Sequence, residues 1–120
     1  MGQLISKPPI PFDVPLCRRD QLQDGRFALE TDQGDALLVM AIGDDLHVVD
    51  GLCPHQYFPL EFADLEQQTI LVCPLHGWRF NVTTGQSPDV AQICLNHWPA
   101  IERDGFVYAV QSDAPAAGTP

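Results

Sequence analysis

The sequence predicts an all-β fold in which a β-sandwich or β-barrel base carries a small inserted β-subdomain. Three observations indicate this arrangement. Short apolar and β-branched runs at residues 27–31, 36–42 and 46–50 are separated by turn sequences. Near the end of the chain an Asp-Gly pair is flanked by alternating side chains, as in a β-hairpin. Between these parts lie two Cys-Pro segments, and short apolar runs flank the second of them.

The first part of the base is predicted to be one helical turn followed by consecutive hairpins. Residues 18–22 are predicted to form the helical turn, which ends before Gly25. The sequence Asp-Gln-Gly-Asp joins 27–31 to 36–42, and Gly-Asp-Asp joins 36–42 to 46–50. Both connections are rich in residues that form turns, so neighbouring runs are predicted to pair.

The middle of the chain, residues 51–85, is predicted to be the inserted subdomain. Residues 69–72 are predicted to enter the second Cys-Pro segment as a strand, and residues 78–82 to leave it as another. The stretch 60–68 contains no glycine. A helical turn and a longer loop both remain open for it.

A single domain is predicted to account for the whole chain. The flanking segments 12–50 and 86–111 are predicted to form the base, which a hairpin at 102–110 closes. The ends, 1–11 and 112–120, are rich in proline and small residues that join a sheet poorly. They are therefore predicted to be flexible.

Length and composition narrow the class of protein. A chain of 120 residues with 45% hydrophobic residues can bury a modest core, and no apolar run is long enough to span a membrane. Its start lacks the apolar core of a secretory signal, which predicts a cytoplasmic protein without a membrane anchor. Six Lys and Arg against sixteen Asp and Glu give a net charge of −10. Such a charge argues against nucleic acid as a partner and favours proteins with basic docking sites.

Two short segments carry residues with metal-binding chemistry. Each supplies one Cys and one His, in the sequences CPH at 53–55 and CPLHGW at 73–78. Two facing loops of this kind can place two thiolates on one iron of a [2Fe-2S] cluster and two imidazoles on the other. Proline restricts the backbone after each Cys, and Gly77 lets the chain pass close to inorganic sulfide. The predicted ligands are Cys53, His55, Cys73 and His76.

A structural zinc site is the alternative for the same four residues. Two Cys and two His also form a common tetrahedral zinc set. Zinc sites usually pair Cys with Cys and His with His along the chain, whereas the order here is Cys, His, Cys, His. The order favours the iron–sulfur cluster.

Together with the sequence Arg-Phe-Asn-Val-Thr-Thr-Gly at 79–85, these segments resemble the Rieske ferredoxins that serve bacterial oxygenases. The resemblance covers residues 13–111 and implies a Rieske fold, one [2Fe-2S] cluster and no catalytic residues. It also implies that electrons come from a flavin-dependent NAD(P)H reductase and go to a terminal oxygenase.

The resemblance further implies where electrons leave the protein. In this family both ligand histidines reach solvent beside the cluster, which makes His55 and His76 the implied exit towards the partner. Trp78 and Leu75 would contact the partner next to them. Shielding of the cluster from water is the alternative role for these apolar side chains.

The residues of the two loops indicate a branch of the family with a low reduction potential. Rieske proteins of cytochrome bc-type complexes have an extra Cys in each loop, where this chain has Phe58 and Leu75, so their disulfide is excluded. They also have Ser and Tyr hydroxyl donors, where this chain has Trp78 and Phe80. Fewer donors destabilise the reduced cluster, which predicts a potential near the low end of the Rieske range of about −150 to +300 mV.

The resemblance extends to two kinds of oxygenase system. Gln56, Trp78 and the Ser-Pro-Asp at 87–89 resemble ferredoxins of diiron monooxygenases that oxidise toluene or alkenes, which is the preferred interpretation. Ferredoxins of ring-hydroxylating dioxygenases are the alternative. A protein of a different class, the small subunit of nitrite reductase, has this fold but typically lacks the ligand residues, which are all present here.

No chemical role is predicted for the four remaining Cys and His residues. Cys17 and Cys94 are predicted to be small buried hydrophobic residues. His47 is predicted to lie on the solvent side of a strand, and His97 to have a structural role.

Overall fold

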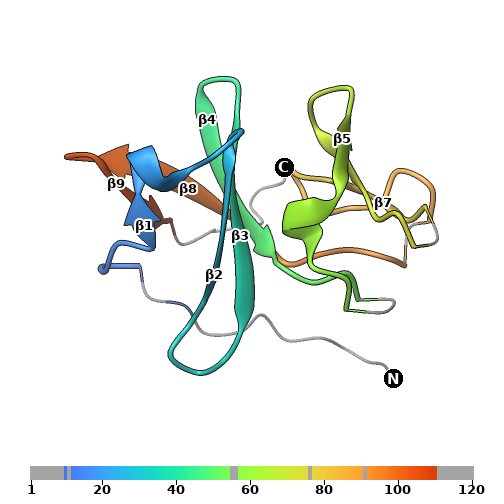
Figure 1. The fold of residues 1–120 in the computed structure, drawn as a ribbon, viewed down its shortest axis with the longest axis horizontal. Helices are drawn as coiled ribbons and strands as arrows, with labels where there is room; N and C mark the ends of the chain where they lie inside the picture. The colour runs from blue at the N-terminus through green and yellow to red at the C-terminus, as the bar shows by residue number, and fades with distance from the viewer. Residues whose placement is uncertain (1–9, 11, 55–56, 76, 91, 111–120) are drawn as a thin grey trace, which may run out of the picture.

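The computed structural model describes residues 10, 12–54, 57–75, 77–90 and 92–110 (Figure 1). Within them the regular elements are nine β-strands and two short 3₁₀ turns. The prediction of an all-β protein is therefore confirmed. No helix in the described part of the chain is both long and apolar enough to cross a bilayer.

Six strands form one antiparallel sheet in the order β1-β9-β8-β4-β3-β2. Their bounds are β1 Cys17–Arg18, β2 Arg26–Glu30, β3 Ala36–Ile42, β4 Asp45–Asp50, β8 His97–Arg103 and β9 Phe106–Ala109. The runs predicted for β2, β3 and β4 agree with these bounds to within one residue. The predicted helical turn is also present, as the 3₁₀ turn η1 (Arg19–Gln21).

The hairpin of β8 and β9 turns at Asp104 and Gly105, as the sequence predicts. Both residues have positive φ, 55° and 86°, which matches the twist of a two-residue hairpin turn. β8 begins at His97 and is thus longer than the predicted strand. It pairs with β4 along this additional length, with His47 opposite Pro99.

A second sheet of three short strands has the order β5-β6-β7. The strands are β5 (Asp64–Glu66), β6 (Ile70–Val72) and β7 (Arg79–Asn81), and the 3₁₀ turn η2 (Leu60–Phe62) precedes them. Strands β6 and β7 were predicted. For residues 60–68 the sequence allows a helical turn or a longer loop. A helical turn is present there as η2, but the strand β5 that follows it is not predicted by the sequence.

The large sheet buries both of its faces, because side chains alternate along β3 and β4. On one face Leu37, Val39 and Val48 join a core with Trp98 and Val107. Ile10 also packs into this core and is only 7% exposed, although it lies in the segment predicted to be flexible. The remaining residues of 1–11, and all of 112–120, lie outside the described residues, and their flexibility remains a prediction.

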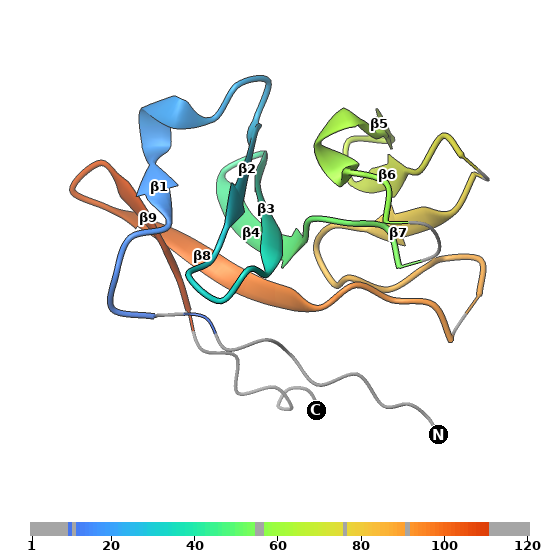
Figure 2. The ribbon, with the colours of Figure 1, turned by 60° about the horizontal axis from the view of Figure 1, so that its bottom comes forward.

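The opposite face of the large sheet packs against the three-stranded sheet. Here Leu38, Met40 and Val49 form a core with Leu71 and Phe80 of the small sheet. Figures 1 and 2 show the small sheet at the end of the molecule opposite the β8–β9 turn.

Polar contacts fix the junction between the two sheets. The backbone N–H of Asn96 donates to Asp50 Oδ2 at 2.7 Å, and the N–H of Asp50 donates to the Asn96 carbonyl at 3.1 Å. Arg26 Nη1 on β2 donates to the carbonyl oxygens of Glu61, at 3.0 Å, and Ala63, at 2.8 Å. These bonds hold η2 and the return of the chain against the base. The division into a base and an insert at 51–85 remains a prediction.

Candidate metal centre

The two cysteines of the predicted cluster site lie in one apolar core. Cys53 is 0% exposed and Cys73 is 1% exposed, and both pack in the core that contains Leu60 and Phe80. The other two predicted ligands, His55 and His76, lie outside the described residues. Two buried thiols in one core, each followed closely by a His in the sequence, are a donor set that fits a thiolate–imidazole iron–sulfur cluster.

Two backbone hydrogen bonds close the first loop around its cysteine. The N–H of Cys53 donates to the Phe58 carbonyl at 2.9 Å, and the N–H of Tyr57 donates to the Cys53 carbonyl at 2.6 Å. Tyr57 has a φ of 59°, in the left-handed region. The loop thus reverses direction within four residues of the cysteine.

The second loop repeats this arrangement at the same spacing. The N–H of Cys73 donates to the Trp78 carbonyl at 2.8 Å, and the N–H of Gly77 donates to the Cys73 carbonyl at 2.8 Å. Gly77 has a φ of 73°. The two cysteines therefore occupy equivalent positions in two loops of the same backbone design, although the loops differ in sequence.

Apolar side chains around the loops divide into two groups. Phe58 and Trp78 are half-buried and pack against the core that holds the cysteines, where they shield it from water. Tyr57 and Leu75 are more exposed, at 72% and 46%. Of the two predicted partner contacts, Leu75 is thus exposed and Trp78 is half-buried, and contact with a partner remains a prediction for both.

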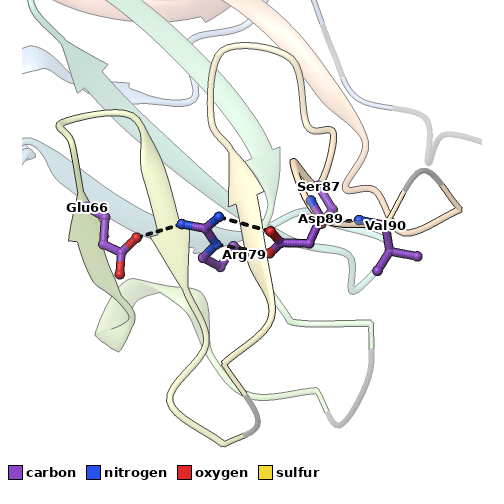
Figure 3. A network of polar contacts seen from close by, with 5 residues as sticks. All are labelled: Glu66, Arg79, Ser87, Asp89 and Val90. Carbon is purple, nitrogen blue, oxygen red and sulfur yellow. Dashed lines mark hydrogen bonds and ion pairs between the residues drawn. The ribbon is translucent and has the colours of Figure 1, made fainter.

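An ion-pair network lies directly beside the second loop (Figure 3). The guanidinium of Arg79 donates to both carboxylate oxygens of Asp89 and to Glu66 Oε1, at 2.9 Å in each case. Ser87 Oγ accepts from the backbone N–H groups of Asp89, at 3.1 Å, and Val90, at 3.3 Å. Arg79 thereby joins β7 to β5 and to the segment after the small sheet. Its hydrogen bonds lower the pKa of Asp89.

Sequence reasoning missed this network. Arg79 and Asp89 were noted only as parts of family-like segments, and Glu66 was not singled out. One signal was available: Arg79 is the only Lys or Arg between Phe27 and Glu102, in a chain with net charge −10. A lone cation in an acidic stretch is a good candidate for ion pairing.

His47 is less exposed than the sequence predicted. His47 is half-buried, and its Nδ1 lies 2.9 Å from Nε2 of His97, with the ring centroids 5.1 Å apart. On the same face of β4 as His47, Asp45 is exposed and Val49 is buried, so this face is covered only in part. Burial lowers the pKa of His47, and nearby Asp45 opposes this shift. The contact with His47 is in keeping with the structural role predicted for His97.

The two remaining cysteines differ from each other. Cys17 is buried, as predicted, and its burial raises the pKa of the thiol to about 11, against the smaller effect of Arg19. Cys94 is exposed, so the prediction of a buried residue was wrong there. It forms an isolated bridge with Gln86, and the neighbouring Leu95 takes the buried position instead.

Comparison with known proteins identifies the family of this arrangement. The family model of the Rieske [2Fe-2S] domain matches residues 12–99. The ferredoxin component of the alkene monooxygenase system of Xanthobacter autotrophicus is 33% identical over 106 residues, which cover 88% of this chain and 86% of that protein.

Solved structures show the same similarity. A ferredoxin of Sphingomonas yanoikuyae B1 superposes with a TM-score of 0.71 at 30% identity, over 82% of this chain and 98% of that one. A chain from a complex of reduced oxygenase and oxidized ferredoxin in carbazole 1,9a-dioxygenase gives a TM-score of 0.69 at 24% identity. The match covers 80% of this chain and 90% of that chain, and at this identity it shows the fold alone.

Proposed function

Because the chain belongs to the Rieske [2Fe-2S] ferredoxins of bacterial oxygenase systems, we propose that it carries single electrons from a flavin-dependent NAD(P)H reductase to a terminal oxygenase. It is an electron-transfer component, not an enzyme. The Rieske domain implies one [2Fe-2S] cluster, which accepts and releases one electron when bound. We place the carrier in the cytoplasm.

The observation that carries the proposal is the equivalence of the two buried cysteines. We assign Cys53 and Cys73 as the thiolate ligands and His55 and His76 as the imidazole ligands. The matching hydrogen bonds at the two cysteines support this assignment, because a binuclear site needs two loops that present their donors alike. Burial of both thiols keeps water from the sulfur atoms.

The oxygenase that the carrier serves is a finer part of the proposal. We favour a diiron monooxygenase system for hydrocarbon or aromatic oxidation, and the 33% identity to an alkene monooxygenase ferredoxin supports this choice. A ring-hydroxylating dioxygenase system is the second candidate, since a ferredoxin from a carbazole dioxygenase complex shares the fold. Neither a zinc protein nor a nitrite reductase subunit explains a complete Rieske ligand set as well.

Metal analysis and EPR spectroscopy test the cofactor and its ligands together. We expect two irons and two acid-labile sulfides per chain. The dithionite-reduced protein should give an EPR signal whose average g value lies below that of all-cysteine clusters, because the reducing electron resides on the histidine-bound iron. Stoichiometric zinc in protein purified without oxygen would contradict the cluster assignment.

Stopped-flow kinetics with purified partners test the direction of electron flow and the choice of oxygenase. The reduced protein is mixed with the oxygenase component of the Xanthobacter alkene monooxygenase system, and separately with the carbazole 1,9a-dioxygenase oxygenase. Faster oxidation by the first supports the monooxygenase proposal.

Since charge attraction is screened over about 8 Å at physiological ionic strength, the rate should fall as salt is added. A rate that stays flat across the salt series would remove electrostatic steering from the proposal.

A further inference from the structure

Tyr57 and Gly77 occupy the same position in the two cysteine loops. Each is four residues after its cysteine, and each donates its backbone N–H to the cysteine carbonyl. Both have a left-handed backbone, with φ of 59° and 73°. Glycine adopts this conformation freely, but an aromatic residue is disfavoured there because its Cβ approaches the backbone carbonyl. The loop thus requires a left-handed backbone at this position, and the Tyr side chain does not favour that backbone.

The Tyr57 ring also contributes little to the core. It is 72% exposed, more than any other large hydrophobic side chain found exposed in the described part of the chain. The next residue, Phe58, packs against the core instead. A large aromatic ring that is both disfavoured by its backbone and exposed to solvent is a candidate for a role in binding.

The surroundings of Tyr57 indicate what it contacts. Residues 51–60 and 73–78 contain no Asp, Glu, Lys or Arg, and Leu75 in the second loop is 46% exposed. Exposed carboxylates begin just beyond the first loop, at Glu61 and Asp64. The two cysteine loops, which we call the tip, thus contain no residue with a full charge and expose the apolar side chains of Tyr57 and Leu75, and the acidic residues Glu61 and Asp64 follow the first loop. A second copy of this chain would bring two charges of −10 together, which disfavours self-association.

We propose that Tyr57 is the docking anchor for the redox partner, and that the partner offers an apolar recess for the Tyr57 ring with basic groups around the rim. This inference rests on the proposed function, since it concerns recognition at the tip where electrons are exchanged. Aromatic residues at the centre of an interface commonly supply much of its affinity. A small contact of this kind suits a transient redox complex.

Two electron acceptors separate docking from the electron transfer itself. Cytochrome c is a basic protein with an exposed apolar haem edge and serves as the protein probe. Hexaammineruthenium(III) is a small cation that needs no apolar docking. In each reaction the reduced protein loses one electron and the acceptor gains it, with no proton or bond transferred. Stopped-flow rates are measured for wild type, Tyr57→Gly and Tyr57→Asn, because both Gly and Asn tolerate a left-handed backbone.

The expected result is a loss of electron-transfer rate with cytochrome c but not with hexaammineruthenium(III). Both Tyr57 variants should keep the visible spectrum and an unfolding midpoint equal to or above that of wild type. Their rate with hexaammineruthenium(III) should stay within about twofold of wild type, and their rate with cytochrome c should fall at least about fivefold, as expected for loss of an interface anchor. Phe62→Ala is the matched control, since Phe62 is an aromatic residue on η2 that is 66% exposed. It should leave both rates unchanged.

Three results would overturn the inference. An unchanged rate with cytochrome c would show that the ring does not dock, and an equal loss with both acceptors would show that Tyr57 acts on the loop. An equal loss in Phe62→Ala would remove the special role of the tip. Failure of the proposed function is distinguishable, because the wild-type protein would then reduce neither acceptor.

Discussion

Arg79 and Asp89 form a two-point ion pair, in which Nε and Nη2 each donate to one carboxylate oxygen at 2.9 Å. The same guanidinium holds Glu66, so one side chain connects the strands on both sides of β6 with the segment that follows the small sheet. Planar two-point pairing fixes geometry as well as charge. The pair is thus placed to hold the small sheet in position beside the second cysteine loop.

The first prediction concerns the pH dependence of this pair. The pKa of Asp89 is lowered from its ordinary value of 3.8, chiefly by the hydrogen bonds from Arg79. A carboxyl group with a lowered pKa stabilises the fold above its ordinary pKa, and this stability is lost as pH falls through the lowered value. Asp89→Asn should therefore be less stable than wild type at neutral pH and equal to it in strong acid. Urea unfolding across pH checks this, and added salt should reduce the difference because the pair is exposed.

The elements that sequence predicted share a local signal. Strands β2, β3 and β4 are runs of apolar residues between turn sequences, and the β8–β9 turn has Asp-Gly at its centre. Strand β5 lacks such a signal, because Asp64, Leu65 and Glu66 are all exposed. Its turn is formed by two glutamines with positive φ, which turn rules do not anticipate.

The early part of β8 was missed for a different reason. Pro99 lies within it, and proline normally argues against an inner strand because it donates no hydrogen bond. Its carbonyl still accepts from the N–H of Val110 at 2.8 Å, so one side of the ladder is kept. Tertiary pairing with β4 overrides the local preference.

The part of the candidate site that the sequence indicates is the part defined by the spacing of Cys and His residues. Cys53 and Cys73 carry the loop motifs, and both lie in one core. The contacts of Arg79 with Asp89 and Glu66, and of His47 with His97, join residues 10, 13 and 50 positions apart. Only the fold brings such residues together, so the sequence could single out Arg79 as a lone cation but could not show which residues it contacts.

The second prediction separates ligand cysteines from the others. Cys73→Ala and His55→Ala should lose the visible spectrum of the cluster and destabilise the two loops, because metal binding and folding of the loops are coupled. Cys94→Ser should keep both the spectrum and the stability, since Cys94 is exposed. Cys17→Ser should keep the spectrum but lose about 1–3 kcal/mol, because its hydroxyl would be buried. A lost spectrum in either Ser variant would show that the ligand set is incomplete.

The third prediction compares two glycines that differ only in their surroundings. Gly85 and Gly34 have similar left-handed backbones, with φ of 84° and 88°. A Cβ at Gly85 would lie 2.2 Å from the Leu95 carbonyl oxygen, whereas nothing lies within 4 Å of one at Gly34. Gly34→Ala should cost about 1–2 kcal/mol for the backbone alone. Gly85→Ala should cost at least about 2 kcal/mol more, because the backbone at Leu95 must move. Equal losses in urea unfolding would contradict the close approach.

The last prediction concerns His47, whose pKa is lowered from its ordinary value of 6.5 by burial. A histidine that stays neutral in the fold contributes its full stability above its ordinary pKa. As pH falls below 6.5 the unfolded chain gains a proton that the folded protein does not, so stability decreases until the lowered pKa is reached. For one group this slope is at most about 1.4 kcal/mol per pH unit.

Urea unfolding of wild type and His47→Gln between about pH 5 and pH 8 measures the contribution of His47 together with its contact to His97, because the other titrating groups are common to both proteins. The stability of wild type relative to His47→Gln should decrease as pH falls through this range. Asp45→Asn is a second variant, and the direction of its effect on the pKa of His47 is known because Asp45 raises that pKa. Without that carboxylate the pKa should fall further, and the loss of stability should continue to lower pH than in wild type. Parallel pH profiles for wild type and His47→Gln would show that the His47–His97 contact does not respond to protonation in this range.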